Sequence, residues 1–209
     1  MTKYATEAIG TLFLVFTIGA AVRSGNPLAP LAIGAVLMAM VYAGGHVSGA
    51  HYNPAVTVAV LVRGRIGLRE AVGYWASQIA GGLVAAALVA TVVPAGQGEA
   101  LTLSGPAIVA AFIAELLVTF ALCYVVLNVA TSKDHPDNSF YGLAIGFTVA
   151  AGAIAVGPIS GGAFNPAVVF AGATMGMFAP STLWIYLVAQ ICAGIAAGFA
   201  FRAINPADK

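Results

Sequence analysis

The stretch GAHYNPAV, from Gly49 to Val56, recurs with few changes as GGAFNPAV, from Gly161 to Val168. Both copies place a polar Asn-Pro-Ala sequence inside a chain that is otherwise strongly apolar. Asn is a favoured N-cap, and Pro suits the first helical turn because its missing N–H would have no partner there. Each copy therefore predicts a helix that begins at its Asn-Pro pair.

These two helices are expected to be short. The apolar runs Asn53–Val62 and Asn165–Met175 fall well below the ~20 residues that a helix needs to cross the hydrocarbon. Gly49 in the first loop, and Gly161 and Gly162 in the second, let the chain approach each run in an extended form. Backbone without regular structure is tolerated at membrane depth only where it is buried in protein or lines a watery cavity. The pattern predicts two re-entrant half-helices whose N-termini meet near the midplane.

The composition indicates one polytopic membrane domain with no soluble domain attached. The chain has 209 residues, of which 61% are hydrophobic and 7% charged, and its mean hydropathy is +0.98. A soluble domain would carry roughly a quarter charged residues. The net charge of +1 and the lack of a basic cluster give no indication of a nucleic-acid partner. Cys123 and Cys192 lie inside apolar spans, so neither a disulfide nor a metal site is expected.

The repeat extends over the whole chain. Shifting the sequence by 112 residues aligns the LAIG at Leu31 with the LAIG at Leu143. Other pairs at this shift are Tyr74 with Tyr186, Gln78 with Gln190 and Gly82 with Gly194; a shift of 108 pairs Glu7 with Glu115 and Thr11 with Thr119. So many coincidences in order indicate an internal duplication, with repeats of about residues 1–98 and 104–209.

Each repeat contains three long apolar spans. The expected spans are Tyr4–Val22, Leu28–Gly45 and Arg69–Val93 in the first repeat, and Pro106–Ala130, Phe140–Gly157 and Pro180–Phe201 in the second. Three crossings is an odd number, so the second repeat must be inverted relative to the first. The predicted fold is an all-α membrane protein, with six transmembrane helices and two re-entrant half-helices in a single channel domain.

The basic residues predict an orientation. Seven of them fall on one side of this arrangement, and only Arg23 falls on the other. The seven are Lys3, Arg63, Arg65, Arg69, Lys133, Arg202 and Lys209. Because basic residues concentrate on the cytoplasmic side, both termini are expected there. The short termini and the lack of sorting signals favour a bacterial or archaeal plasma membrane.

Two facing half-helices have the physical properties of a pore for uncharged molecules. Their N-termini place partial positive charge at one point, which disfavours cations there. The side-chain amides of Asn53 and Asn165 can donate hydrogen bonds to a passing oxygen. Carbonyl groups of residues 49–52 and 161–164 are expected to form a ladder of acceptors. Such a path favours neutral, hydrogen-bonding molecules over ions.

These residues resemble the aquaporins, or major intrinsic proteins. SGAHYNPAVTVA (Ser48–Ala59) and SGGAFNPAVVFA (Ser160–Ala171) are similar to the two signature loops, and TEAIGTLFLVF (Thr6–Phe16) is similar to the first helix. The resemblance implies a pore in every subunit of a homotetramer in the lipid bilayer. Its implied motif residues are Asn53, Pro54, Ala55, Asn165, Pro166 and Ala167. It also implies that Glu7 and Glu115 accept hydrogen bonds from the loops, that His51 lines the pore, and that Gly49, Gly161 and Ala163 support it.

The chain departs from the family at the narrowest point of the pore. The family usually combines an aromatic residue, a histidine, a small residue and an arginine there. The corresponding positions in this chain are Ile33, Ala153, Gly162 and Val168. We expect a wider, apolar and uncharged filter, which could admit water, glycerol, urea, ammonia or hydrogen peroxide, or could dewet and hinder water. Glycerol-conducting relatives usually carry an Asp where this chain has Val169, and they usually have longer loops. The chain therefore resembles a water channel in length, but its filter matches neither common class.

The sequence also leaves room for classes of protein other than a passive channel. A secondary transporter also uses inverted repeats and broken helices, and its coupling residues would have to be Glu7 and Glu115. A structural member of the fold with a closed pore would form tetramers without flux. An intramembrane enzyme is not favoured, because the sequence has no H-E-x-x-H motif and its three histidines suggest no nucleophile–base pair. No catalytic residue, metal site or cofactor is expected.

Overall fold

The computed structural model describes residues 1–94 and 100–208, and within them the chain is helical. In chain order the helices are α1 (Thr2–Arg23), α2 (Ala29–Ser48), α3 (Pro54–Arg63), α4 (Leu68–Val92), α5 (Pro106–Ala130), α6 (Tyr141–Ser160), α7 (Pro166–Thr174), the 3₁₀ turn η1 (Pro180–Thr182) and α8 (Leu183–Ile204). The boundary that the sequence places near residue 98 lies outside the described residues.

Six of these helices are long and apolar enough to cross a membrane: α1, α2, α4, α5, α6 and the combined η1–α8. Large apolar side chains point outward along them, among them Leu117, which is 61% exposed, Phe147 at 59% and Phe199 at 58%. An outer surface of this kind suits lipid. α3 and α7 have 10 and 9 residues, so they are half-helices. The predicted fold class of six spans and two half-helices is therefore confirmed.

The second and sixth helices end three residues later than predicted. α2 continues to Ser48 and α6 to Ser160, although the expected spans ended at Gly45 and Gly157. Each helix stops at a glycine in the left-handed conformation, Gly49 with φ 82° and Gly161 with φ 83°. These two glycines act as helix C-caps rather than as parts of an extended approach, as the sequence analysis had supposed.

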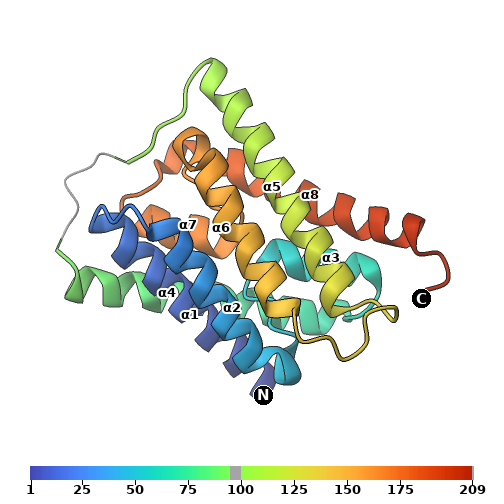
Figure 1. The fold of residues 1–209 in the computed structure, drawn as a ribbon. Coiled ribbons are helices and arrows are strands. Elements are labelled where there is room, and N and C mark those ends of the chain that lie inside the picture. Colours follow the sequence, from blue (N-terminus) through green and yellow to red (C-terminus); the bar gives the residue numbers. More distant parts are fainter. Residues whose placement is uncertain (95–99, 209) are drawn as a thin grey trace.

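The two halves of the chain make matching contacts (Figure 1). α1 packs against α4 as α5 packs against α8, and α1 packs against α2 as α5 packs against α6. Each half-helix also crosses into the other half, since α3 packs against α8 and α7 against α4. The half-helices are therefore enclosed by long helices, which satisfies the condition for irregular backbone within a membrane.

α2 and α6 cross at glycines that leave no room for a side chain. A Cβ added at Gly146 would lie 2.8 Å from Met38 Cβ and closer still to Gly34 O. We expect Gly146→Ala to destabilise the protein by about 1–3 kcal/mol through overpacking, measured as a lower unfolding temperature in detergent. Gly157→Ala on the same helix is the matched control, since its Cβ would meet nothing within 4 Å. An equal effect of the two substitutions would contradict the close crossing.

Ion pairs tie several segments together at the end of the bundle that carries both termini. Lys3 contacts Glu70 at 2.7 Å. The Asp208 carboxylate accepts hydrogen bonds from Arg63 Nη2 at 2.6 Å, Arg65 Nη2 at 3.2 Å and Lys133 N at 2.9 Å. Six of the seven basic residues that the sequence groups on one side lie at this end; the seventh, Lys209, is outside the described residues. Asp208 thus joins the end of α3 to the α5–α6 connection.

Asp208 is expected to stabilise this end at neutral pH. Its burial acts to raise its pKa, but the Lys133 N–H and the Arg63 guanidinium outweigh burial and hold the pKa below its usual value. A lowered folded-state pKa gives a contribution that is complete above about pH 4 and is lost as the pH falls further. Asp208→Asn, whose amide N–H₂ would face these donors, should lower the unfolding temperature by several degrees at pH 7. Asp134→Asn, at an exposed position, should leave it unchanged; equal effects would refute the role.

Candidate functional site

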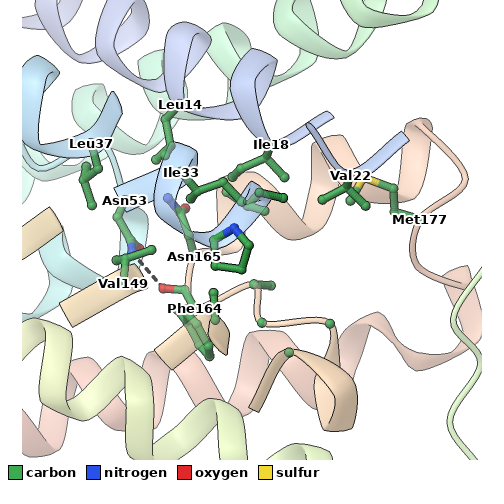
Figure 2. Close-up of a pocket in the computed structure, with 18 of the residues that line it drawn as sticks. Leu14, Ile18, Val22, Ile33, Leu37, Asn53, Val149, Phe164, Asn165 and Met177 are labelled. Atoms are coloured by element: carbon green, nitrogen blue, oxygen red, sulfur yellow. Dashed lines mark hydrogen bonds between the residues drawn. The ribbon is translucent and has the colours of Figure 1, made fainter. Parts of the chain in front are cut away.

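The N-termini of the two half-helices meet through reciprocal hydrogen bonds. Asn53 Nδ2 donates to Phe164 O at 2.8 Å, and Asn165 Nδ2 donates to Tyr52 O at 2.9 Å; Figure 2 shows the first of these as a dashed line. Each Asn also caps its own helix, because its Oδ1 accepts from the N–H of Ala55 at 2.8 Å or of Ala167 at 2.9 Å. Both caps form as predicted.

Each asparagine keeps a donor that these bonds do not use. An amide nitrogen carries two N–H groups, and one of them is committed to the opposite loop. Pro54 and Pro166 occupy the first helical positions, and Ala55 and Ala167 behind them are fully or almost fully buried. The free N–H groups and two helix N-termini together form a fixed positive potential at one point.

Two of the carbonyl groups expected in the acceptor ladder are already engaged. Tyr52 O and Phe164 O each accept one bond from an asparagine, which leaves each carbonyl oxygen one further lone pair for a solute. Both residues have a φ of 49°, in the left-handed region that is uncommon for residues other than glycine. This conformation turns each carbonyl toward the opposite asparagine, and it is held by burial, since each residue is 1% exposed.

Two buried glutamates hold the loops in this conformation. Glu7 accepts from Ser48 Oγ at 2.7 Å, His51 N at 2.9 Å, Tyr52 N at 2.7 Å and Gln78 Nε2 at 2.8 Å. Four donors surround each carboxylate, and both glutamates are 0% exposed.

Glu115 is held in the same way by the second half of the chain. It accepts from Ser160 Oγ at 2.7 Å, Ala163 N at 3.0 Å, Phe164 N at 2.8 Å and Gln190 Nε2 at 2.8 Å. The donors are of the same kinds in both halves and come from matching positions. A carboxylate with both oxygens occupied in this way is a loop anchor.

The serines that begin the two signature loops, Ser48 and Ser160, complete these anchors, a role that the sequence pattern did not predict. Besides bonding the glutamates, Ser48 and Ser160 each accept at their carbonyl a hydrogen bond of 2.7 Å from a tyrosine hydroxyl, that of Tyr74 or Tyr186. The serines also coincide at the shift of 112 residues. That coincidence was the signal that would have found them.

Besides the Tyr52 hydroxyl, which donates to Met40 O at 3.0 Å and has no counterpart on Phe164, His51 makes a clear difference between the two loops. Its Nδ1 lies 3.0 Å from Thr57 Oγ1, which also accepts from Gln78 Nε2 at 3.0 Å. The matching positions in the second half are Ala163 and Val169, which offer no polar side chain. His51 lines the cavity described next, and its ring is fixed through Nδ1, so Nε2 is the nitrogen left for a solute.

A cavity of about 740 Å³ passes the two asparagines, reaching Val126 and Ile145 on the side of the termini and Val22 and Arg23 at the opposite face of the bundle. Figure 2 shows Asn53, Asn165 and Ile33 in succession, with Val22 and Met177 farther along. All four positions threaded to the family's filter line it: Ile33, Ala153, Gly162 and Val168. Gly162 lies beside Ala153, since a Cβ at Gly162 would be 3.5 Å from Ala153 Cα. The wall around these four positions is apolar and carries no filter arginine.

A second cavity, of about 280 Å³, opens near the end that carries the termini. It lies between the ends of α2 and α5 and residues 135–138. Gly49 lines this cavity, whereas the next residue, Ala50, lines the larger one. The two cavities therefore reach the first Asn-Pro-Ala loop at adjacent residues. Within residues 1–94 and 100–208, no group of His, Cys, Asp and Glu side chains could hold a metal ion.

Comparison with known proteins agrees with this arrangement. A model of the family described as "Major intrinsic protein" matches residues 1–201. The chain belongs to this family. Among its members, Glycerol uptake facilitator protein-like 6 of Lactiplantibacillus plantarum is 41% identical over 222 aligned residues that cover 100% of both chains. Aquaporin NIP1-2 of Arabidopsis thaliana is 32% identical, over 100% of this chain and 76% of its own length.

A solved structure has the same fold. The aquaglyceroporin from Plasmodium falciparum superposes with a TM-score of 0.82 and 21% sequence identity, and the match covers 98% of this chain and 97% of that one. The resemblance stated from the sequence is thus confirmed. As a major intrinsic protein, the chain is a passive membrane channel for water and small uncharged solutes.

Proposed function

We propose that this channel conducts glycerol and similar small uncharged solutes as well as water. The observation that carries the proposal is the 740 Å³ cavity, whose wall at Ile33, Ala153, Gly162 and Val168 is apolar and unobstructed by a long side chain. A three-carbon polyol can place its carbon backbone against such a wall. Its hydroxyl groups can bond the free N–H groups of Asn53 and Asn165. The relative named Glycerol uptake facilitator protein-like 6 supports the same solute class.

The proposal assigns a role to each part of the site. The four filter positions set the width of the path, and the Asn-Pro-Ala segments orient the solute and oppose cations through their helix dipoles. Gly49 and Gly161 end the helices that lead into the loops, and the backbone N–H of Ala163 anchors the second loop to Glu115. His51 offers one ring nitrogen on the side of the termini.

The proposal includes the orientation of the chain in the membrane and its assembly. Residues 1–98 and 104–209 act as two inverted repeats of a single domain in the plasma membrane. Both termini lie in the cytoplasm, because the described basic residues concentrate at that end. Four copies of the 21.0 kDa chain form the homotetramer, each with its own pore. Light scattering in detergent would test the tetramer.

The alternative of a coupled transporter has less support. It requires Glu7 or Glu115 to bind an ion or a proton during transport, yet each carboxylate is held by four donors. Releasing either one would free the loop that it anchors. We assign the chain no catalytic activity, in keeping with its membership of a channel family.

Stopped-flow light scattering on proteoliposomes tests the proposal. An impermeant osmolyte reports water loss, and a glycerol gradient reports glycerol uptake through re-swelling. We expect both rates to exceed those of protein-free vesicles at least tenfold. Fast water loss without faster glycerol re-swelling would restrict the function to water. No acceleration of either rate would favour a closed structural member of the fold.

A further inference from the structure

One formally charged side chain lines the larger cavity, among the residues that the structure describes. It is Arg23, the last residue of α1, at the mouth opposite the termini. Its neighbours in the cavity wall include Val22, Met175 and Met177, and Figure 2 shows Val22 and Met177 together at the end of the cavity far from Asn53. Any solute that uses this mouth passes the guanidinium.

A hydrogen bond fixes Arg23 relative to the half-helix α7. Its Nη2 donates to Met175 O at 3.0 Å, and Met175 is the C-cap of α7. Asn165 is the N-cap of α7, whose 9 residues separate its two ends by about 14 Å at 1.5 Å per residue. Val168 lies in the first turn of α7. Arg23 therefore lies on the mouth side of the filter, beside the end of α7 that is opposite to Val168.

The electrostatics of α7 explain why a cation at this point matters. A helix carries partial negative charge at its carbonyl end, and that end of α7 faces the mouth. Without a counter-charge it would attract cations toward the pore. A guanidinium has five N–H donors, so Arg23 can bond Met175 O and still present positive charge to the mouth.

The other half-helix provides an internal comparison. Arg202 on α8 donates from Nη1 to Val62 O at 3.3 Å, near the carbonyl end of α3. Each half-helix thus has an arginine that donates a hydrogen bond near its carbonyl end. Arg202 is exposed and is not among the residues lining either cavity. Of these two arginines, only Arg23 both bonds the carbonyl end of a half-helix and lines the larger cavity.

We propose that Arg23 sets the charge selectivity of the channel, by repelling cations at the mouth in place of the arginine that is missing at Val168. This role rests on the function proposed above. A unit charge a few ångströms away in water changes the local concentration of a monovalent cation about fivefold. The barrier is therefore of modest size and adds to that of the helix N-termini at Asn53 and Asn165.

The test compares two permeants of similar planar shape, uncharged urea and the guanidinium cation. Both are supplied as radiolabelled tracers to proteoliposomes, and the readout is the ratio of their permeabilities, so that the number of active channels cancels. Arg23→Gln, which keeps a donor for Met175 O but removes the charge, should raise the guanidinium-to-urea ratio about fivefold. Arg23→Lys, which keeps the charge, should resemble the native chain.

Two further variants separate a charge effect from a structural one. Arg202→Gln removes the matching arginine outside the cavities and should leave the ratio unchanged. In the double variant Val168→Arg/Arg23→Gln, the arginine restored at the filter should return the ratio to the native value or below. An unchanged ratio in Arg23→Gln would overturn the proposal, and so would an equal rise in Arg202→Gln.

A measurement on the native chain covers the case in which Arg23→Gln fails to insert. Raising the ionic strength with a large impermeant salt shortens the Debye length from about 30 Å at 0.01 M to about 3 Å at 1 M. Screening of Arg23 should then raise the guanidinium-to-urea ratio, and a constant ratio would contradict the proposal. Failure of the proposed function would show differently, as native urea and glycerol permeabilities no higher than those of protein-free vesicles.

Discussion

Val168→Arg is expected to lower the glycerol permeability about tenfold, which corresponds to about 1.4 kcal/mol of added barrier. Val168 is 3% exposed and lines the cavity on the first turn of α7. An arginine there would extend into the cavity toward Ile33 and Ala153 and narrow the path. Water permeability should fall less, because a water molecule is smaller and can bond the guanidinium. Stopped-flow re-swelling in glycerol, divided by the water rate, measures the effect.

Val168→Ala is the matched control at the same position. It removes volume without adding charge, so we expect a glycerol-to-water ratio at or above the native value. If Val168→Arg kept the native ratio, the filter would not lie at Ile33, Ala153, Gly162 and Val168. The narrowest point of the path would then have to lie in another part of the cavity.

Glu115→Gln is expected to cause the largest loss of stability. All four groups around Glu115 point donors at its two oxygens, and an amide can accept at only one of them. At least one buried donor must then face an N–H₂ group, and such a loss costs about 1–3 kcal/mol for each group left unsatisfied. For two such groups we expect the free energy of unfolding to fall by about 3 kcal/mol and the unfolding temperature to fall by about 6–12 °C.

Glu70→Gln makes the same chemical change at a solvent-accessible ion pair. Glu70 contacts Lys3 at 2.7 Å, and the two side chains are 33% and 53% exposed. Pairs of this kind contribute about 0–1 kcal/mol, so its unfolding temperature should stay within a few degrees of the native value. Similar losses in Glu70→Gln and Glu115→Gln would mean that Glu115 does not anchor the second loop.

Much of the fold was predictable because its signals are local or repeated. The lengths of the apolar spans are set by the thickness of the bilayer, and α5 has the predicted bounds Pro106–Ala130. The Asn-Pro pairs mark helix starts through simple capping chemistry. The ends of α2 and α6 were harder to predict, because whether Gly49 caps a helix or begins a loop depends on the contacts that hold the following residues.

The site was predictable as a set of residues but not as a set of bonds. The repeat and the resemblance brought forward Glu7, Glu115, Asn53 and Asn165. The reciprocal bonds from the asparagines to the opposite loop depend on two left-handed residues, and a single sequence does not encode such φ values visibly. For this reason the bonds that Tyr52 O and Phe164 O accept were not predicted.

Arg23 shows a different limit of sequence reasoning. In the sequence it was the one exception to the grouping of basic residues and carried no further meaning. Its importance depends on the end of α1 lying beside the end of α7, more than 150 residues later in the chain, with a bond of 3.0 Å between them. A contact of that separation has no local signal.

The kinetics of glycerol flux through the native chain test the central claim, that this protein is a passive channel, most directly. Initial uptake rates would be measured in proteoliposomes over a wide range of glycerol gradients, with and without ionophores that collapse proton and sodium gradients. We expect rates that rise in proportion to the glycerol gradient and do not change with the ionophores. Rates that saturate and fall when the ion gradients are removed would contradict the account and point to a coupled transporter.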